Sequence, residues 1–575
     1  MKILINHLGY TIGRRKIGIL QSTEPFAQAP VVQLVEEGSG KVLSEFQGAG
    51  NEPVKGWSGR WFSQIDFTDI EQPGSYYFAK GDHHSPAFKI WDRDHLQEEP
   101  LSDILHYFKS QRSGGIYDHH DASCPVFGED RKVDVRGGWY DASGDVSKYL
   151  SHLSYANMMN PQQTPLVVWN LLKAHELLSS SKSTGDYTLE RILAEATFGG
   201  DFLVRMQDPA GYFYMIVFDV WSKDITKREI CSYATQEGHK LDSYQAGFRQ
   251  GGGMAIAALA RLSRSTTTGA FDSATYLSCA EKGYDHLKVH NLEYLDDGNA
   301  NIIDAYCALM AIVELYQSVD GEKKSYYLTE ARDWAATLMS YQANHPEYGS
   351  IWMADADRQR PYFHASDAGL PGIAILEYLK IEPEESRSDE VKSCCASALK
   401  AELSMSSSVW NPFGYPRQIT QNIHGERKTA FFFPHENESG YWWQGENARV
   451  ASLAAFAELA KTQIELDEQQ TASCEQYSTQ AVDWILGLNP FDVCMLDGHG
   501  WNNPSYWPEA GYYNAKGGVC NGVTSGFDDE ADLAFKPEPH GSDPQHSWRW
   551  GEQWIPHGAW LFLAIAARSE YQKDI

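Results

Sequence analysis

The feature that most constrains the fold is a change of hydrophobic period near residue 95. Before it, residues 1–92 hold short apolar stretches separated by Gly, Pro and Asp turn signals, at the spacing typical of a β-sandwich. After it, apolar residues recur at helical spacing, as in Ile302, Tyr306, Leu309 and Val313. The pattern therefore predicts a β-sandwich domain followed by an all-α domain that spans residues 93–575.

Helical periodicity predicts about twelve helices. They lie near 95–111, 164–179, 187–207, 243–263, 270–290, 302–316, 322–343, 365–380, 386–405, 443–464, 466–487 and 554–570. Twelve helices with long loops between alternate pairs suit an (α/α)6 barrel, in which the loops at one end gather residues that are distant in sequence. The linker Asp92-Arg93-Asp94 is short, so we expect the two domains to dock rigidly.

Composition narrows the class of partner. The chain has 575 residues, 42% of them hydrophobic and 22% charged, which is normal for a large globular protein. A formal charge of -29 argues against nucleic acid or an anionic membrane as partner, because like charges repel at long range. It mildly favours a neutral or cationic ligand such as a small oligosaccharide, although solubility explains the charge more simply.

Cysteines and the first residues give an expected location. Nine cysteines are dispersed over a long chain, and this fits reduced thiols better than a disulfide framework. Met1 to Tyr10 run directly into a strand-like segment, and no apolar run approaches the length of a membrane span. We therefore expect a cytoplasmic protein, as a monomer or a weak homo-oligomer.

Two acidic stretches carry the candidate chemistry. Residues 137–145 read Gly-Gly-Trp-Tyr-Asp-Ala-Ser-Gly-Asp, and residues 548–554 read Trp-Arg-Trp-Gly-Glu-Gln-Trp. Hydrolysis of a glycosidic bond needs one protonated carboxyl to protonate the leaving oxygen and one ionised carboxyl to activate water. Asp141 and Asp145 lie close enough to share a water, and Glu552 among tryptophans is expected to keep its proton near neutrality.

Each of these carboxylates also has a structural interpretation. An Asp in a glycine-rich turn usually accepts hydrogen bonds from its own backbone. Pro556 indicates the first turn of a helix, so Glu552 could instead complement the positive end of that helix, which would lower its pKa. Spacing alone does not decide between these interpretations.

The first stretch, followed by Lys148-Tyr149, resembles the Gly-Gly-Trp-Tyr-Asp-Ala-Gly-Asp signature of glycoside hydrolase family 9. Further segments in that family's order are Gln-Arg-Ser-Gly at 111–114, Phe-Arg-Gln-Gly-Gly-Gly at 248–253 and Ile-Leu-Gly-Leu-Asn-Pro at 485–490. The resemblance implies an inverting hydrolase with Asp145 as catalytic base, Asp141 as the partner that fixes the water and Glu552 as general acid. The N-terminal domain resembles the immunoglobulin-like domain that precedes some catalytic domains of the family.

Two departures from the family pattern affect this assignment. Ser143 is an additional residue between the two aspartates, which leaves open which of them takes the proton, with Asp145 preferred. The family's cellulases carry a Pro-His-His-Arg stretch that holds glucose hydroxyls, whereas residues 502–508 here read Asn-Asn-Pro-Ser-Tyr-Trp-Pro.

The variant motif resembles the branch of the family that acts as exo-β-D-glucosaminidase. It implies removal of glucosamine from the non-reducing end of chitosan-derived oligosaccharides. An ammonium group would be recognised by carboxylates through charge-assisted hydrogen bonds. For this we favour Glu446, with Trp442 or Trp443 stacking on a sugar ring and with Tyr140 and Trp550 completing the predicted substrate-binding set.

Two other functions stay open. One is a β-1,4-glucanase of the same fold that acts on cello-oligosaccharides. The other is a phosphorylase or a catalytically idle sugar-binding protein, which the absence of an evident basic cluster for phosphate makes unfavourable.

No metal or other cofactor is expected. His119, His120 and Cys124 lie where some relatives hold zinc, but Ser113 stands in place of a cysteine, so we do not expect a complete zinc site. The acidic run 528–532 offers oxygen ligands for a structural calcium ion, yet it lacks a fixed loop pattern and is better interpreted as a solvated surface.

Overall fold

The N-terminal domain is a β-sandwich. We describe a computed structural model that covers residues 1–180 and 184–568. One sheet has the order β1 (Lys2–Leu4), β3 (Ile17–Ser22), β7 (Trp61–Asp66) and β6 (Ala49–Glu52). The other has the order β2 (Tyr10–Thr11), β10 (Phe88–Trp91), β8 (Gly74–Lys80), β4 (Val31–Glu36) and β5 (Val42–Gln47), with β9 (His83–His84) paired to β8.

The two sheets enclose one apolar core. Leu20 from the first sheet and Leu34 and Phe78 from the second belong to a single buried cluster. All strand pairs are antiparallel except β2 with β10. The predicted sandwich is confirmed.

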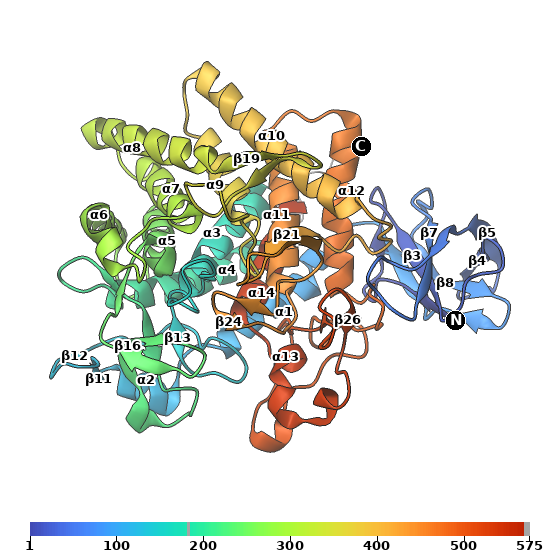
Figure 1. Ribbon diagram of the computed structural model, residues 1–575, viewed down its shortest axis with the longest axis horizontal. Coiled ribbons are helices and arrows are strands. Elements are labelled where there is room, and N and C mark those ends of the chain that lie inside the picture. The colour runs from blue at the N-terminus through green and yellow to red at the C-terminus, as the bar shows by residue number, and fades with distance from the viewer. Residues whose placement is uncertain (181–183, 569–575) are drawn as a thin grey trace.

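The rest of the chain is mainly helical (Figure 1). Six helices are almost wholly buried: α3 (Thr164–Ser180), α5 (Gly253–Ser263), α7 (Ile302–Gln317), α9 (Leu370–Leu379), α11 (Asn447–Gln463) and α14 (Ile555–Ala567). Their contacts run in a cycle, from α3 through α5, α7, α9, α11 and α14 back to α3. Because these helices are surrounded by other helices, they are apolar on nearly all sides.

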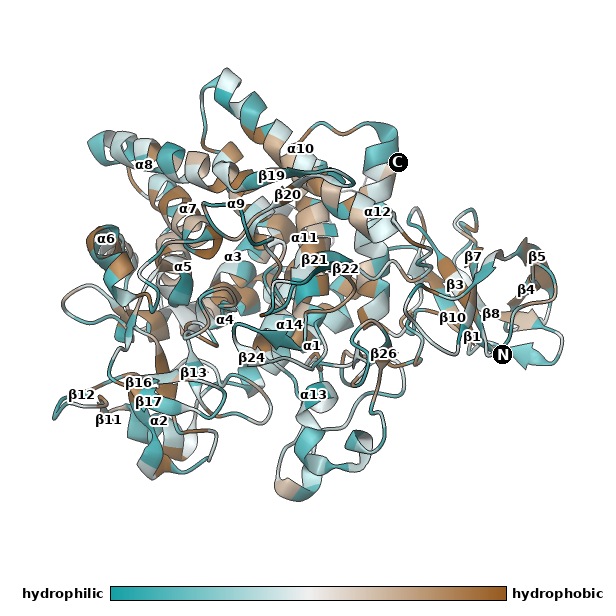
Figure 2. Ribbon diagram, in the orientation of Figure 1, coloured by the Kyte–Doolittle hydropathy of each residue, from teal (hydrophilic) through white to brown (hydrophobic). Residues whose placement is uncertain are grey.

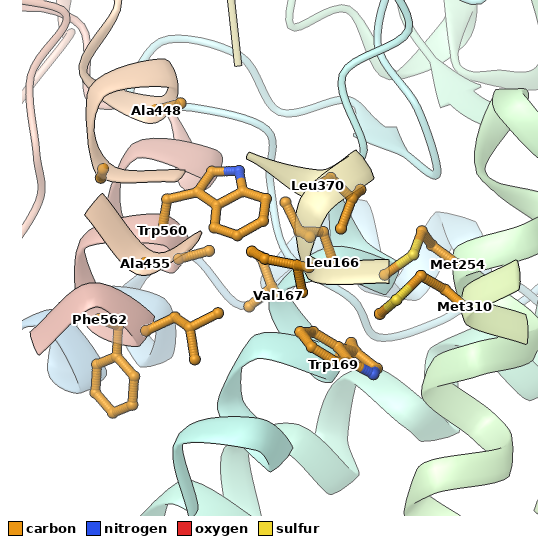
Figure 3. Close-up of a cluster of buried hydrophobic side chains, with 14 of the residues drawn as sticks. Leu166, Val167, Trp169, Met254, Met310, Leu370, Ala448, Ala455, Trp560 and Phe562 are labelled. Atoms are coloured by element: carbon orange, nitrogen blue, oxygen red, sulfur yellow. The ribbon is translucent and has the colours of Figure 1, made fainter. Parts of the chain in front are cut away.

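Figure 3 shows how these helices meet. Leu166 of α3, Met254 of α5, Met310 of α7, Leu370 of α9 and Trp560 of α14 point into one cluster. All five side chains are completely buried.

Six further helices pack on the outside of this cycle, one against each inner helix. They are α1 (Glu99–Ser110), α4 (Asp186–Arg205), α6 (Ser273–His290), α8 (Gly321–Ser340), α10 (Glu385–Ser407) and α12 (Glu468–Ile485). Figure 2 shows long hydrophilic stretches on α8, α10 and α12, as expected for helices with one face in solvent. Each of the twelve predicted helical segments contains a helix.

The loops contain shorter elements. The short helices are α2 (Gly115–Asp121), α13 (Trp548–Gly551), the π-helix η3 (Phe248–Gly252) and the 3-10 turns η1 (His95–Gln97), η2 (Ile225–Lys227), η4 (Asn291–Tyr294), η5 (Pro508–Ala510), η6 (His540–Ser542) and η7 (Pro544–His546). The short strands are β11 (Cys124–Pro125), β12 (Lys132–Val133), β13 (Lys148–Tyr149), β14 (Phe213–Tyr214), β15 (Ile216–Phe218), β16 (Glu229–Ala234), β17 (His239–Leu241), β18 (Gln245–Ala246), β19 (Gln342–His345), β20 (Gly349–Trp352), β21 (Gln418–Gln421), β22 (Arg427–Ala430), β23 (Glu436–Asn437), β24 (Gly440–Tyr441), β25 (Thr524–Ser525) and β26 (Leu533–Ala534). None of the described helices is both long and apolar enough to cross a membrane.

The two domains share a packed interface. The ring of Trp57, which is 2% exposed, lies 5.0 Å from Phe431 and 6.0 Å from Trp484 of α12. The Asn6 side chain donates a 2.7 Å hydrogen bond to Asp483. The sandwich therefore lies beside α12, at the right of Figure 1.

Candidate active site

The two acidic stretches lie side by side, although about four hundred residues separate them in sequence. Ala142 pairs with Trp554 in an antiparallel bridge, and the Ile555 N–H donates to the Asp141 carbonyl at 3.1 Å. The Ser143 N–H donates to the Gln553 carbonyl at 2.9 Å. Backbone pairing thus fixes the turn 137–145 against the segment that carries Glu552.

A cavity of about 430 Å³ opens at this junction. Its lining residues are Asp141, Gly144, Asp145, His152, Leu153, Tyr155, Trp221, Tyr233, Gln236, Tyr441, Trp442, Gln444, Tyr506, Tyr512, Trp548, Arg549, Glu552 and Trp554. All three predicted catalytic carboxylates share it. Aromatic rings dominate the remaining wall, and such rings pack well against the apolar faces of sugars.

Asp145 is held by donors that favour its ionised form. Its carboxylate accepts hydrogen bonds from the Ser147 N–H at 2.7 Å and from the Tyr149 hydroxyl at 3.0 Å. Burial is the largest influence and raises the pKa of Asp145 to about 6, because the apolar surroundings disfavour the charged form more than the donors favour it. Asp145 is therefore ionised near neutral pH.

Asp141 accepts a 3.0 Å hydrogen bond from the Trp554 indole N–H. Its pKa lies well above the usual range, because the side chain is buried and lies close to the charges of Asp145 and Glu552. The donors that hold Asp145 favour its ionised form, and this supports Asp145 as the base.

Glu552 follows the short helix α13 and precedes α14, which begins at Ile555 with Pro556 in its first turn. Burial, followed by the nearby Asp145 charge, raises its pKa to about 8. The Tyr506 hydroxyl donates to Glu552 Oε1 at 3.4 Å. Burial therefore outweighs any effect of the helix end, and Glu552 keeps its proton at neutral pH.

Glu446 is not where the prediction placed it. It is absent from the cavity lining and is 2% exposed. Its carboxylate accepts hydrogen bonds from Arg449 Nε and from the Phe433 N–H, both at 2.7 Å. The prediction that Glu446 binds a substrate amine is wrong in this structure, because a guanidinium three residues along the chain already neutralises the carboxylate.

Three of the four predicted aromatic contacts also lie outside the lining. Trp443 and Trp550 are each 1% exposed and pack edge-to-face with each other, 6.2 Å between ring centroids. Tyr140 exchanges hydrogen bonds with the backbone of Gly114. Trp442 alone of the four lines the cavity.

Sequence reasoning missed several lining residues. Trp548 and Arg549 belong to the second acidic stretch, and Tyr506 belongs to the segment that departs from the family pattern. These segments were singled out from the sequence, but the sequence did not predict that the three side chains line the cavity. Trp221 and Tyr233 come from the loop between α4 and α5, and no sequence motif marked them as lining residues.

Arg549 is a half-buried cation with unusual surroundings. It donates to His546 Nδ1 and to the Trp443 carbonyl, and its guanidinium lies over the Trp443 and Trp548 rings. Within residues 1–180 and 184–568, no carboxylate pairs with it. Burial lowers its pKa to about 10, so it remains charged at neutral pH.

One group of side chains has the composition of a metal site. His120, Asp121 and Cys124 bring ligand atoms within 4.8 Å of one another, whereas His119 is not part of the group. However, Asp121 is bound by Arg228 through both oxygens, at 2.8 and 2.9 Å, and by Lys148 at 2.7 Å. Two cations beside one carboxylate disfavour a divalent ion, so these residues do not fit zinc.

The acidic run 528–532 is engaged in hydrogen bonds and ion pairs. Glu530 pairs with Lys428 and accepts a hydrogen bond from the His435 N–H, and Asp532 binds Ser58 of the sandwich domain. Among the described residues these carboxylates do not form a group suited to an ion.

The family is decided by comparison with known proteins. The model for glycosyl hydrolase family 9 matches residues 98–522, and the model for the cellulase N-terminal Ig-like domain matches residues 1–85. The chain belongs to glycoside hydrolase family 9. The matched range includes Asp141 and Asp145, while Glu552 lies beyond its end.

Solved structures share the fold, two of them over 99% of this chain. A metagenome-derived family 9 endoglucanase is 19% identical, with a TM-score of 0.67 over 99% of this chain and 98% of that one. A family 9 protein of Bacteroides ovatus is 17% identical, with a TM-score of 0.66 over 99% and 98%. An endoglucanase of the termite Nasutitermes takasagoensis is 15% identical, with a TM-score of 0.52 over 82% and 98%. A search of curated protein sequences found no match.

Proposed function

We propose that this family 9 member hydrolyses a β-glycosidic bond with inversion, using Glu552 as general acid and Asp145 as general base. The observation that carries the proposal is the shared cavity in which burial raises the pKa of Glu552 to about 8 and that of Asp145 to about 6. Near neutral pH one carboxyl is then protonated and the other ionised, as an inverting glycosidase requires.

The proposed reaction is a single displacement. Asp145 takes a proton from a water molecule, whose oxygen attacks the anomeric carbon. Glu552 gives its proton to the glycosidic oxygen as that bond breaks. Asp141, held by Trp554, hydrogen-bonds the same water and orients it.

For the substrate we favour a short, neutral, β-1,4-linked gluco-oligosaccharide. Two of the structures described above are named endoglucanases, and the aromatic lining suits uncharged sugar rings. Arg549 supports the same choice, because a guanidinium in the wall with no carboxylate partner among the described residues can donate to hydroxyls but repels an ammonium group.

A β-D-glucosaminide at the non-reducing end is the second candidate. It is supported by the two aspartates, which give the cavity acidic groups in addition to Glu552. A cationic amine bound beside them would gain charge-assisted hydrogen bonds. The loss of Glu446 as an amine ligand weakens this candidate.

The deciding experiment incubates the enzyme with cellobiose, cellotriose and the corresponding fully deacetylated glucosamine oligomers, read by proton NMR. We expect hydrolysis of the glucose series and an α-anomer as the first product. Cleavage restricted to glucosamine oligomers would move the assignment to the second candidate, and a β-anomer formed first would exclude inversion. Inactivity of the wild-type protein on every β-linked oligomer would overturn the proposal of hydrolysis itself.

Three broader features complete the proposal. The cycle of inner-helix contacts supports an (α/α)6 barrel for the catalytic domain, which we place at residues 93–575 after a sandwich domain at 1–92. A cytoplasmic location and a monomeric or weakly oligomeric state stay predictions from sequence.

A further inference from the structure

Ser143, the additional residue between the two aspartates, forms a reciprocal pair with the residue after Glu552. Its N–H donates to the Gln553 carbonyl at 2.9 Å, and its side-chain oxygen accepts from the Gln553 N–H at 3.0 Å. The serine side chain thus supplies the acceptor that a backbone carbonyl supplies in a regular ladder. It extends the pairing of the two segments up to the residue next to the acid.

Among the described residues, the Gln553 N–H donates to Ser143 Oγ and to no other acceptor. Its side chain is completely buried, and its amide is held at both ends by the backbone of Ala515, each bond 2.9 Å long. Its carbonyl also accepts a 2.8 Å bond from the Tyr107 hydroxyl. Removal of the Ser143 hydroxyl would leave a donor without a partner in a packed site, a situation that favours local displacement.

The same hydroxyl reaches the other side of Glu552 through Asn514. Ser143 Oγ donates to Asn514 Oδ1 at 3.2 Å, and Asn514 Nδ2 donates to the Gly551 carbonyl at 2.8 Å. The residues immediately before and after Glu552 are therefore tied to one network that begins between Asp141 and Asp145.

We propose that Ser143, together with Asn514, is a positioning residue that sets the distance between the acid Glu552 and the two aspartates. This inference rests on the proposed function. An inverting hydrolase needs its two carboxyl groups about 6.5–9.5 Å apart so that a water fits between one of them and the sugar. In this chain the pairing register of residues 141–145 against 552–555 determines that separation. The Ser143 hydroxyl holds this register at the pair formed with Gln553, next to Glu552.

The test compares two substrates that differ in their need for the general acid. A substrate with a good leaving group reacts with little need for protonation of that group. Ser143→Ala is compared with wild type on an unactivated disaccharide and on an aryl glycoside of the same sugar with an acidic phenol. We expect kcat on the disaccharide to fall about 10-fold to 100-fold and kcat on the aryl glycoside to fall less than about 3-fold. Asn514→Ala should show the same asymmetry, and Ser143→Thr, which keeps a hydroxyl, should restore most of the disaccharide activity.

A matched control comes from Ser452, whose side-chain oxygen also accepts a buried backbone N–H, that of Gly369 at 3.1 Å, outside the cavity lining. Ser452→Ala should lower Tm without changing the ratio of the two rates. Equal losses on both substrates in Ser143→Ala would show a merely structural role and overturn the inference while leaving the proposed hydrolysis intact. If Ser143→Ala does not fold, Asn514→Ala and Ser143→Thr decide by the same ratio.

Discussion

At the scale of single residues, the site works by separating the proton affinities of similar groups. Asp145 accepts two hydrogen bonds within 3.0 Å, whereas the Tyr506 hydroxyl contacts Glu552 at the longer distance of 3.4 Å. Donors favour the ionised form of a carboxylate, and burial disfavours it. Burial and the Asp145 charge hold the pKa of Glu552 near 8, and the shorter hydrogen bonds to Asp145 help to keep its pKa lower, near 6.

This separation predicts a bell-shaped pH dependence of kcat/KM. Activity requires Asp145 ionised, which holds above about pH 6, and Glu552 protonated, which holds below about pH 8. We expect a maximum near pH 7 on an unactivated oligosaccharide, measured by reducing-sugar release from pH 4 to 10. An aryl glycoside with a good leaving group should lose the alkaline limb, and an alkaline limb that persists with this substrate would contradict the role of Glu552.

The raised pKa of Glu552 also predicts a gain of stability on its removal. The folded protein holds this proton up to about pH 8, whereas the unfolded chain releases it near the ordinary glutamate pKa of 4.5. Stability is therefore lost as pH rises between these values, because the folded state binds more protons there. Glu552→Gln does not ionise, so its free energy of unfolding should exceed that of wild type by on the order of 2 kcal/mol at pH 8.5 and by much less at pH 5.

Urea unfolding at the two pH values measures this difference. The exposed Glu465 supplies the control, because Glu465→Gln removes an acid that has no such burial. A Glu552→Gln variant that is less stable than wild type at pH 8.5 would contradict this prediction. Loss of activity in the same variant, with the fold retained, separates function from stability.

The corrected residue shows what a single sequence could have revealed. Glu446 was chosen from a polar, aromatic-rich loop, but it is the N-cap of α11 and pairs with Arg449 in the first turn. A Glu and an Arg three residues apart at a helix start are neighbours on one face, so this pairing was readable from spacing. The burial that excludes both from solvent was not, because it depends on Phe433 and on loops distant in sequence.

At the scale of elements, helices were predictable and their beginnings were not. The apolar period located all twelve long helices, since inner helices need apolar surfaces on most sides. The predicted helix 243–263 in fact starts with the π-helix η3 and continues as α5 from Gly253, because Gly251 has a φ of 102°. Short loop elements such as α13 depend on tertiary contacts and carry no period.

Close packing of α4 against the catalytic turn gives a prediction at this scale. A Cβ on Gly199 would lie 2.3 Å from Trp139 and 2.5 Å from Val168. Gly199→Ala gains helix propensity of about 1 kcal/mol, but overpacking costs about 1–3 kcal/mol or more, so we expect net destabilisation. Trp139 lies two residues before Asp141, so kcat should also fall.

Thermal unfolding measures the predicted loss of stability in Gly199→Ala, and kcat on a disaccharide measures the predicted loss of activity. Gly185→Ala, at the N-cap of the same helix, is the control because a Cβ there meets no atom of the described residues within 4 Å. It should change stability by less than about 1 kcal/mol and leave kcat unchanged. Unaltered stability and kcat in Gly199→Ala would show that α4 does not support the turn.

At the scale of the whole molecule, the sequence predicted a β-sandwich followed by a helical domain, but not how the two join. The short linker correctly indicated close docking. The contacts themselves, Trp57 against Phe431 and Trp484 and Asn6 against Asp483, involve residues that no local pattern marks. Such long-range contacts become visible only when the fold brings both surfaces together.

This interface predicts that the two domains unfold together. Trp57 belongs to the sandwich domain in sequence but is buried in the same core as the helices, and Asp483 of α12 lies buried against Asn6. We expect one calorimetric transition for the wild type. Trp57→Ala should cost about 3–5 kcal/mol, as for other large-to-small changes in a core, and should lower Tm for the whole molecule.

Val31→Ala, at a residue 47% exposed in the same domain, is the control and should leave Tm nearly unchanged. Two resolved transitions in the wild type, with only the smaller one moved by Trp57→Ala, would show that the sandwich folds independently and does not stabilise the catalytic domain.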